Sequence, residues 1–424
     1  MKISAIERYK GKYHFSVNFY SLFLIATFIP DLLRFDAVFI KYAYWFVKVF
    51  LACVIIYKDK RSLLNPSQIE LLYFLFVLIY AAIIFIDIFV APDSILSKTD
   101  TFVSSGVVDF VGFCLGVIIA FSFRYDPAYH SEKSLRFFWV SLTVALILSY
   151  FLSIESFDLD TTNGRYDANT TINSIMYGQA GCALALISIL GALESKKRFV
   201  KILFIITILV GLVSIGKAGS RSPVIVLGIV SIFYFIARGG IYKSVLIIAS
   251  ILSVIIIFIN QIIAFLESIG STLVVRLTSM IMDKETSGRD AIYTNAWNLI
   301  KESPFFGSFY LIRSGPGIGG YPHNFLLEVF MATGLFGGIP FMILLIISIY
   351  RSYKIIKNRH QASWIAVLYL QIIAYGMFST GLYTSQDFWV LLFFVISMNR
   401  TIFLNSREKL QFSKAKNPSE QLLN

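Results

Sequence analysis

The 424-residue chain is 57% hydrophobic and only 15% charged, with a mean hydropathy of +0.73 and a formal net charge of +12. Soluble domains carry about 25% charged residues, so this composition excludes an ordinary soluble protein. Many apolar runs reach about 18 residues without alternating apolar and polar positions, which indicates membrane-spanning helices and excludes a membrane barrel. The predicted fold class is an all-α, polytopic membrane protein.

About twelve membrane-spanning helices are predicted along the chain. The stretch 199–237 resembles one long helix, but two glycines and a proline in GKAGSRSP divide it. The spans are predicted at about 14–33, 37–57, 69–91, 101–123, 136–154, 173–193, 199–216, 222–237, 243–264, 323–350, 362–383 and 387–404.

The distribution of basic residues predicts the orientation of these spans. With the N-terminus inside, 25 of the 37 lysines and arginines fall in inner segments and 11 fall on the outer side. Short inner loops of membrane proteins are enriched in Lys and Arg, so both termini are predicted to be cytoplasmic. This topology accounts for the basic charge, and no nucleic-acid partner is expected. Of the four histidines, only His323 falls on the outer side.

The spans and loops divide the chain into four predicted parts. Residues 1–264 hold nine transmembrane helices, and 265–322 form a large extracytoplasmic loop with a short amphipathic helix. Residues 323–404 hold the last three transmembrane helices, and 405–424 form a disordered cytoplasmic tail. A second elaborated outer loop is predicted at 153–173. Two long outer loops indicate binding or chemistry on that face.

The short helix of the large loop begins in TSGRDAIYTNAW. Ser287 is a predicted N-cap with Asp290 completing a capping box, and Ser303-Pro304 ends the helix. Its apolar residues share one face, which is expected to lie on the membrane surface. These residues are Ile292, Ala296, Leu299 and Ile300.

Three arginines fall on three separate outer segments. Arg289 lies in the first turn of the short helix, Arg221 opens a span within GSRSP, and Arg165 lies in NGRYD. Each has an ordinary alternative, since an arginine at a membrane boundary often snorkels or is simply solvated. Guanidinium groups bind phosphate bidentately, so three of them brought together would form an anion site.

His323 follows a glycine-rich stretch and precedes a long apolar run, within GIGGYPHNFLLEVF. A histidine is able to accept a proton near neutral pH, so His323 is a candidate general base. The alternative is an interfacial histidine at a helix start, and Asn324 is expected either to cap that helix or to orient the ring. The acidic residues within spans, which are candidates for function or helix pairing, are Asp87, Asp109 and Glu328. The three cysteines lie in apolar runs, and no Cys/His cluster has the spacing of a metal site, so no metal and no cofactor are predicted.

Four motifs, taken in order, resemble the O-antigen ligase and polymerase superfamily of bacterial membrane enzymes. They are NGRYDANTTIN, GSRSP at the start of a span, SGRDAIYTNAWNLIKESPFFG and YPHNFLLEVFMATGLFGG. The resemblance covers about 160–345, and the first five spans match only in hydropathy. One departure is Pro223, where a small residue is expected, and it changes how the helix of Arg221 begins.

The resemblance implies a GT-C-like helical fold and a metal-independent glycosyltransferase that uses a glycan donor on undecaprenyl diphosphate. Arg221 and Arg289 match the arginines that bind the diphosphate, and His323 matches the histidine that assists the acceptor hydroxyl. Arg165 and Asn324 are further candidates for substrate binding. The implied location is the bacterial inner membrane, with a periplasmic active site. The lipid bilayer, a chain-length regulator and a flippase are the other implied partners.

Three readings of this pattern remain open. The compact GGYPHNFLLE motif favours a polymerase of lipid-linked repeat units for O-antigen or capsular polysaccharide. An O-antigen ligase, which moves the finished glycan onto lipid A-core, would need the same donor site. A flippase or transporter belongs to a different class; such proteins often contain two related halves, and no internal repeat is visible in this sequence.

Overall fold

The computed structural model describes residues 25, 38–58, 66–90, 100–124, 129, 131–152, 154–156, 165–167, 173–282 and 289–398. Nearly all of the span predicted at 14–33, the tail predicted at 405–424 and the predicted cap Ser287 lie outside these residues.

Helices make up most of the described chain. In order they are α2 Val38–Lys58, α4 Gln68–Phe85 continued by the π-helix η2 Ile86–Val90, α5 Asp100–Ser122, α6 Glu132–Leu152, α7 Ser174–Glu194, α8 Arg198–Ala218, α9 Arg221–Ile257, α10 Ile259–Ser268, α11 Leu273–Met282, α12 Arg289–Glu302, α13 Phe325–Lys357, α14 Ser363–Gly376 and α15 Gln386–Ser397. Two short strands, β1 Ile154–Ser156 and β2 Arg165–Asp167, pair antiparallel with Ser156 opposite Arg165. They are an addition to the all-α prediction and lie between α6 and α7.

The helices are those of a polytopic membrane protein. Among the described residues, six helices are long and apolar enough to cross a membrane, and four shorter helices are also apolar. Each predicted span from residue 37 onward overlaps one of the described helices. The class predicted from composition is therefore confirmed.

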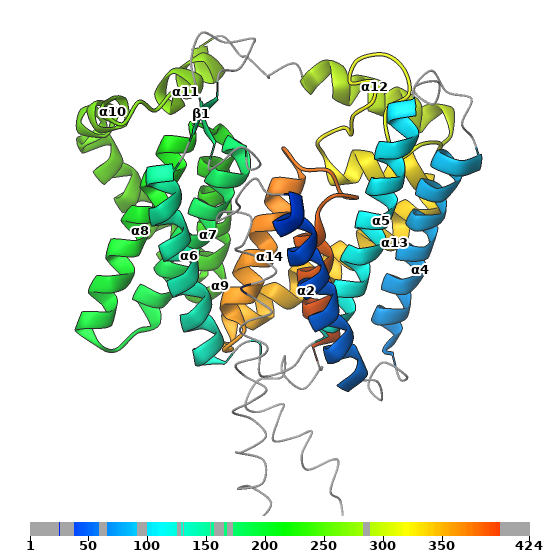
Figure 1. Cartoon of the computed structure of the whole chain (residues 1–424). Coiled ribbons are helices and arrows are strands. Elements are labelled where there is room, and N and C mark those ends of the chain that lie inside the picture. Colours follow the sequence, from blue (N-terminus) through cyan, green and yellow to red (C-terminus); the bar gives the residue numbers. More distant parts are fainter. Residues whose placement is uncertain are drawn as a thin grey trace, which may run out of the picture.

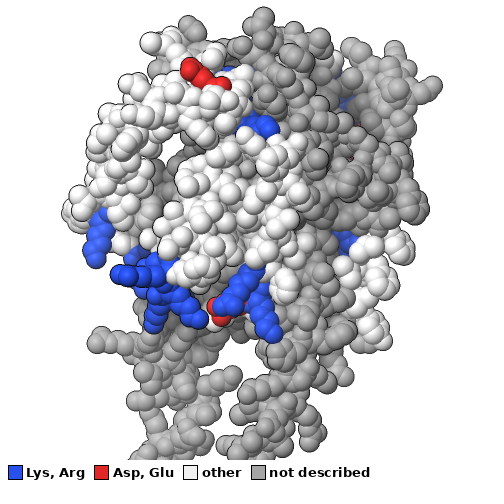
Figure 2. Space-filling model, turned by 60° about the vertical axis from the view of Figure 1, so that its left-hand side comes forward, with Lys and Arg blue, Asp and Glu red and all other residues white. Residues whose placement is uncertain are grey.

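The two ends of the helices differ in the connecting elements and the basic residues that they carry. We call the end that carries β1, α10, α11 and α12 the loop end (Figure 1). Figure 2 shows lysine and arginine side chains gathered at the opposite end, beneath a broad uncharged surface, and we call this the basic end. The turn between α7 and α8 and the break in α9 carry exposed basic residues. They are Lys196, Lys197, Arg198, Lys201 and Lys243.

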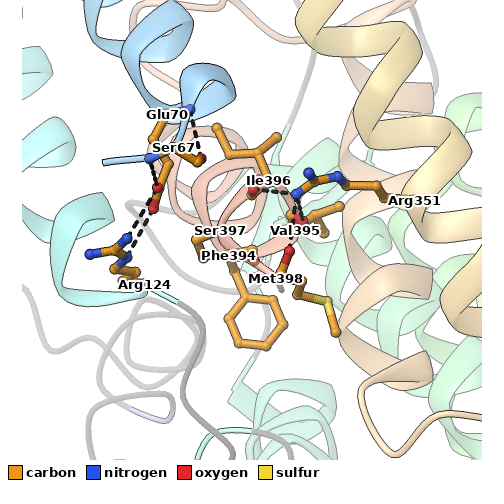
Figure 3. Close-up of polar contacts among 9 residues, drawn as sticks. All are labelled: Ser67, Glu70, Arg124, Arg351, Phe394, Val395, Ile396, Ser397 and Met398. Carbon is orange, nitrogen blue, oxygen red and sulfur yellow. Dashed lines mark hydrogen bonds and ion pairs between the residues drawn. The ribbon is translucent and has the colours of Figure 1, made fainter. Parts of the chain in front are cut away.

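Charged side chains join helix ends at the basic end, and among them Glu70 is buried (Figure 3). Ser67 and Glu70 form a capping box at the start of α4, and Arg124 pairs with Glu70 at 2.9 Å. Arg351 of α13 donates to the backbone carbonyls at the C-terminal end of α15, including that of Met398 at 3.3 Å. A cation at that position complements the negative end of the helix dipole.

The break predicted within GKAGSRSP is present. α8 ends at Gly219, which has the left-handed φ of 64° typical of a helix C-terminus, and α9 begins at Arg221. Pro223 lies in the first turn of α9, where its missing N–H costs no helical hydrogen bond. Gly178 of α7 leaves room for the proline ring, since a Cβ there would lie 2.5 Å from Pro223 Cγ.

Helix α13 contains a break that residues 304–308 fill. Gly334 has φ 57° and ψ −152°, so the helix is interrupted after its first nine residues. The carbonyls of Pro304 and Phe305 accept from the N–H groups of Leu335 and Phe336 at 2.8 and 3.0 Å. Unpaired backbone groups are costly in an apolar environment, so the loop replaces hydrogen bonds that the helix has lost.

Substituting Gly334 with alanine is expected to destabilise the protein by roughly 2–5 kcal/mol, because both strain and overpacking result. A Cβ at this position would lie 2.4 Å from the Phe305 carbonyl carbon, on a backbone conformation that only glycine adopts readily. The matched control is Gly228→Ala in α9, where a Cβ meets nothing within 4 Å. Unfolding in mixed detergent micelles measures both variants. Equal stability of the two would contradict the packing described.

Candidate functional site

The candidate site lies at the loop end, where α12, the start of α13 and the connection between α14 and α15 meet. We call this connection, residues 377–385, the 377–385 segment. It contacts His323, Asn324 and Arg289, which come from two of the predicted motifs, through backbone groups that no sequence pattern indicates.

His323 immediately precedes α13 and has a left-handed backbone with φ 53°. A non-glycine residue in this region is strained, and such residues cluster at functional sites. Its ring lies 4.5 Å from that of Tyr321, and within the described chain its Nδ1 is buried without a hydrogen-bond partner. Burial and the nearby Arg289 lower the pKa of His323, and a hydrogen bond with the Ser379 backbone partly offsets them. The lowered pKa favours the neutral imidazole, the form that accepts a proton.

Asn324 caps α13 and also contacts the 377–385 segment. Its side-chain oxygen accepts from the N–H groups of Leu326 and Leu327 at 3.0 and 3.1 Å, as an N-cap residue does. Its amide nitrogen donates to the carbonyl of Met377 at 3.2 Å. The helix-capping alternative for Asn324 is therefore confirmed. By capping α13 directly after His323, it also fixes the backbone that carries the histidine.

Arg289 begins α12 and reaches the same segment. Its guanidinium donates to the carbonyl of Phe378, next to the residue whose backbone meets His323. A cation in the first turn opposes the helix dipole. An anion bound between the guanidinium and the free N–H groups of that turn would offset this unfavourable charge–dipole interaction. Arg289 and His323 thus meet backbone groups of adjacent residues, Phe378 and Ser379, in the 377–385 segment.

Helix α12 has the apolar face that the sequence predicts, but this face covers protein. Ala296, Leu299 and Ile300 are buried and form a small core with Ile312 and Met331. The expectation that this face lies on the membrane surface was wrong, because Met331 of α13 and the following loop provide a closer apolar partner. The packing gives Arg289 a rigid support.

The glycine-rich stretch before His323 forms a tight turn held by α12. Gly315, Gly317 and Gly319 all have φ between 74° and 84°, which other residues adopt rarely. Asn295 of α12 donates to the carbonyls of Ser314 and Pro316 at 2.6 and 2.9 Å. The glycines therefore allow the tight backbone turn that leads the chain into α13.

Two acidic residues predicted within spans form buried contacts near the loop end, and one of them, Glu328, binds the 377–385 segment. Asp87 in η2 pairs with Arg313, which lies between α12 and α13, and both side chains are at least 95% buried. It also accepts from the N–H of Tyr310 at 3.3 Å. Glu328 in the first turn of α13 accepts from Tyr80 and from two N–H groups of the 377–385 segment. Arg313 and Tyr80 were not predicted, because nothing local in the sequence indicates partners more than 220 residues away.

Arg221 contacts a different part of the loop end. Its Nη1 donates to the carbonyl of Arg276 in α11 at 3.3 Å, whereas Arg289 contacts the 377–385 segment. Arg165 lies in β2, which packs beside α7 and α8, and its side chain is outside the described atoms. The structure thus places Arg221 against α11 and groups Arg289, His323 and Asn324 around one segment. Across the described residues, no three His, Cys, Asp or Glu side chains are arranged to hold a metal ion.

Comparison with known proteins gives one family match. A family model described as O-antigen ligase matches residues 206–342, which contain Arg221, Arg289, His323 and Asn324. Arg165 falls outside the matched residues. A search of curated proteins found no match to the chain. The family match supports the resemblance indicated by the sequence motifs: residues 206–342 of this multi-pass membrane protein are similar to the O-antigen ligase family.

Proposed function

We propose that the protein is a membrane glycosyltransferase that polymerises oligosaccharide repeat units carried on undecaprenyl diphosphate. The observation that carries the proposal is the meeting of Arg289 and His323 on the 377–385 segment, inside the residues that match the O-antigen ligase family. The guanidinium of Arg289 suits a phosphate, and the imidazole of His323 suits an acceptor hydroxyl. Transfer from a lipid diphosphate to a hydroxyl requires both.

The proposed reaction is a displacement at the anomeric carbon of the donor sugar. The acceptor hydroxyl oxygen forms the new glycosidic bond, its proton passes to His323, and the bond from the anomeric carbon to the phosphate oxygen breaks. The electron pair leaves with the diphosphate. Arg289 and Arg221 stabilise the charge that grows on it, the role that fixed cationic donors commonly fill. Arg165 and Asn324 are proposed to contact substrate as well.

The proposed location is the bacterial inner membrane, with the loop end in the periplasm and both termini in the cytoplasm. The gathering of basic side chains at the opposite end supports this orientation, since cytoplasmic loops are enriched in Lys and Arg (Figure 2). With about twelve spans and a large outer loop, we propose a GT-C-like architecture. A flippase and a chain-length regulator are the proposed partners.

The second candidate is an O-antigen ligase, and the description of the matching family favours it. A ligase transfers the finished glycan from undecaprenyl diphosphate to lipid A-core. Both enzymes need the donor site described above, so Arg221, Arg289 and His323 serve either reaction. The acceptor distinguishes the two.

Purified protein in lipid nanodiscs, given a defined lipid-linked repeat unit, is expected to form a ladder of longer lipid-linked glycans on a gel. The ladder should persist in EDTA, since the proposed mechanism uses no metal. Products that form only after lipid A-core is added would establish the ligase. Movement of intact donor across a vesicle membrane, without any new glycosidic bond, would refute a transferase and favour transport.

A further inference from the structure

Glu328 is a buried carboxylate whose hydrogen bonds all come from outside its own helix. It is fully shielded from solvent in the first turn of α13. Its Oε1 accepts from the hydroxyl of Tyr80 in α4 at 2.6 Å and from the N–H of Tyr383 at 3.2 Å. Its Oε2 accepts from the N–H of Leu382 at 2.8 Å. A buried carboxylate is tolerated only when its oxygens are satisfied, and here three donors satisfy them.

Side chains at the start of α13 form hydrogen bonds with the 377–385 segment at two points. Asn324 binds the carbonyl of Met377 near the start of the segment, and Glu328 binds two N–H groups near its other end. These two side chains are four residues apart and lie on one face of the helix. The Trp389 indole adds a third anchor by donating to the carbonyl of Leu382 at 3.0 Å.

The 377–385 segment contains the backbone groups that contact both candidate functional side chains. Phe378 provides the carbonyl for Arg289, and Ser379 provides the backbone partner of His323. Gly381 lies under the ring of Tyr321, which in turn contacts the His323 ring. Any shift of the segment would therefore move Arg289 and His323 relative to each other.

We infer that Glu328, supported by Tyr80, is a positioning residue that sets the distance between Arg289 and His323 by fixing the 377–385 segment. This inference rests on the proposed function, because it assigns those two groups to one reaction. Glu328 does not act on substrate, since no part of it is exposed. Its effect reaches the reaction through the backbone of residues 378–383.

Only a carboxylate fits these partners. The hydroxyl of Tyr80 and the N–H groups of Leu382 and Tyr383 all donate, so both side-chain oxygens must accept. Glutamine would turn an NH₂ group toward at least one of these donors. The N–H facing that amide would lose its partner, and the 377–385 segment would shift by a fraction of an ångström or more. The shape of the side chain is otherwise unchanged.

The test compares Glu328→Gln and Tyr80→Phe with Tyr369→Phe as the matched control. The Tyr369→Phe variant also loses a buried hydroxyl hydrogen bond, which joins Tyr369 to Ser348 at 2.6 Å. Neither of these two residues belongs to the 377–385 segment. All are assayed as full-length protein in nanodiscs, with kcat and the donor KM measured on monodisperse material. The double variant of Tyr80 and Glu328 is included.

Glu328→Gln is expected to lower kcat by about 100-fold with the donor KM little changed, because small displacements of reacting groups carry costs of this size. Tyr80→Phe should give a smaller loss, of about 5-fold, since one hydrogen bond is removed and the carboxylate stays. The double variant should be no slower than Glu328→Gln alone. Tyr369→Phe should retain the wild-type kcat.

Other outcomes would overturn the inference. If Glu328→Gln and Tyr369→Phe lose the same fraction of activity, Glu328 has only a structural role. If Glu328→Gln does not fold, Tyr80→Phe decides the matter, and wild-type kcat in that variant refutes the inference. The failure of the proposed function is separate: wild-type protein would then form no glycosidic bond. Activity in the wild type with none in His323→Ala, together with normal kcat in Glu328→Gln, would reject this inference alone.

Discussion

Replacing His323 with alanine is expected to reduce glycan extension by roughly 10²- to 10⁴-fold while leaving the amount of folded protein unchanged. The histidine lies directly before α13 with its Nδ1 unpartnered within the described chain, so its removal breaks no hydrogen bond of that nitrogen. Burial and Arg289 keep its pKa below the usual value, and it therefore stays ready to accept a proton. The assay is ladder formation by purified protein.

Two further variants separate the chemistry of His323 from its backbone strain. His323→Asn tolerates the left-handed φ of 53° better than alanine and still lacks a base. It should be as inactive as His323→Ala. His360→Ala removes a histidine from the connection between α13 and α14 at the basic end and should remain active. Extension at the wild-type rate in His323→Asn would remove the histidine from the mechanism.

Replacing Arg289 with glutamine is expected to lower kcat by about 10²- to 10³-fold, the range found when one fixed donor to a developing anion is removed. It should also change the pH dependence. A neighbouring cation disfavours protonated histidine, so Arg289 lowers the pKa of His323, and its loss should raise that pKa. Activity falls as the histidine becomes protonated. The acidic limb of the pH–rate profile should therefore move to higher pH.

The control for this variant lies on the same helix. Lys301→Gln removes a positive charge from the last turn of α12, at a position exposed to solvent and distant in sequence from the 377–385 segment. It should keep both the wild-type rate and the wild-type pH profile. Arg289→Lys should keep the pH profile, because the charge remains, but it should lose rate because an ammonium lacks the planar fork. A profile that does not move in Arg289→Gln would separate Arg289 from His323.

Much of the fold was readable from local signals. Uninterrupted apolar runs predicted the helices, and Gly219 with Pro223 marked the boundary between α8 and α9. Asn324 was expected either to cap α13 or to orient the histidine ring, and it caps the helix. These predictions succeeded because each depends on residues within a few positions of one another.

The parts that were missed depend on contacts distant in sequence. Glu328 lay in an apolar run with no visible partner, and its donors come from α4 and from the 377–385 segment. Arg313 was one basic residue among five in the large loop, and its pairing with Asp87 joins residues 226 positions apart. The break at Gly334 was hidden because MATGLFGG remains apolar throughout, and its hydrogen bonds are supplied by residues 304–305.

The filled break in α13 limits how this part of the protein can move. Residues 304–308 exchange backbone hydrogen bonds with α13 on both sides of Gly334, and Gly307 and Gly334 approach so closely that neither tolerates a Cβ. Peeling this loop away would strand several amide and carbonyl groups in an apolar layer. The loop and the helix are therefore expected to travel as one body with His323.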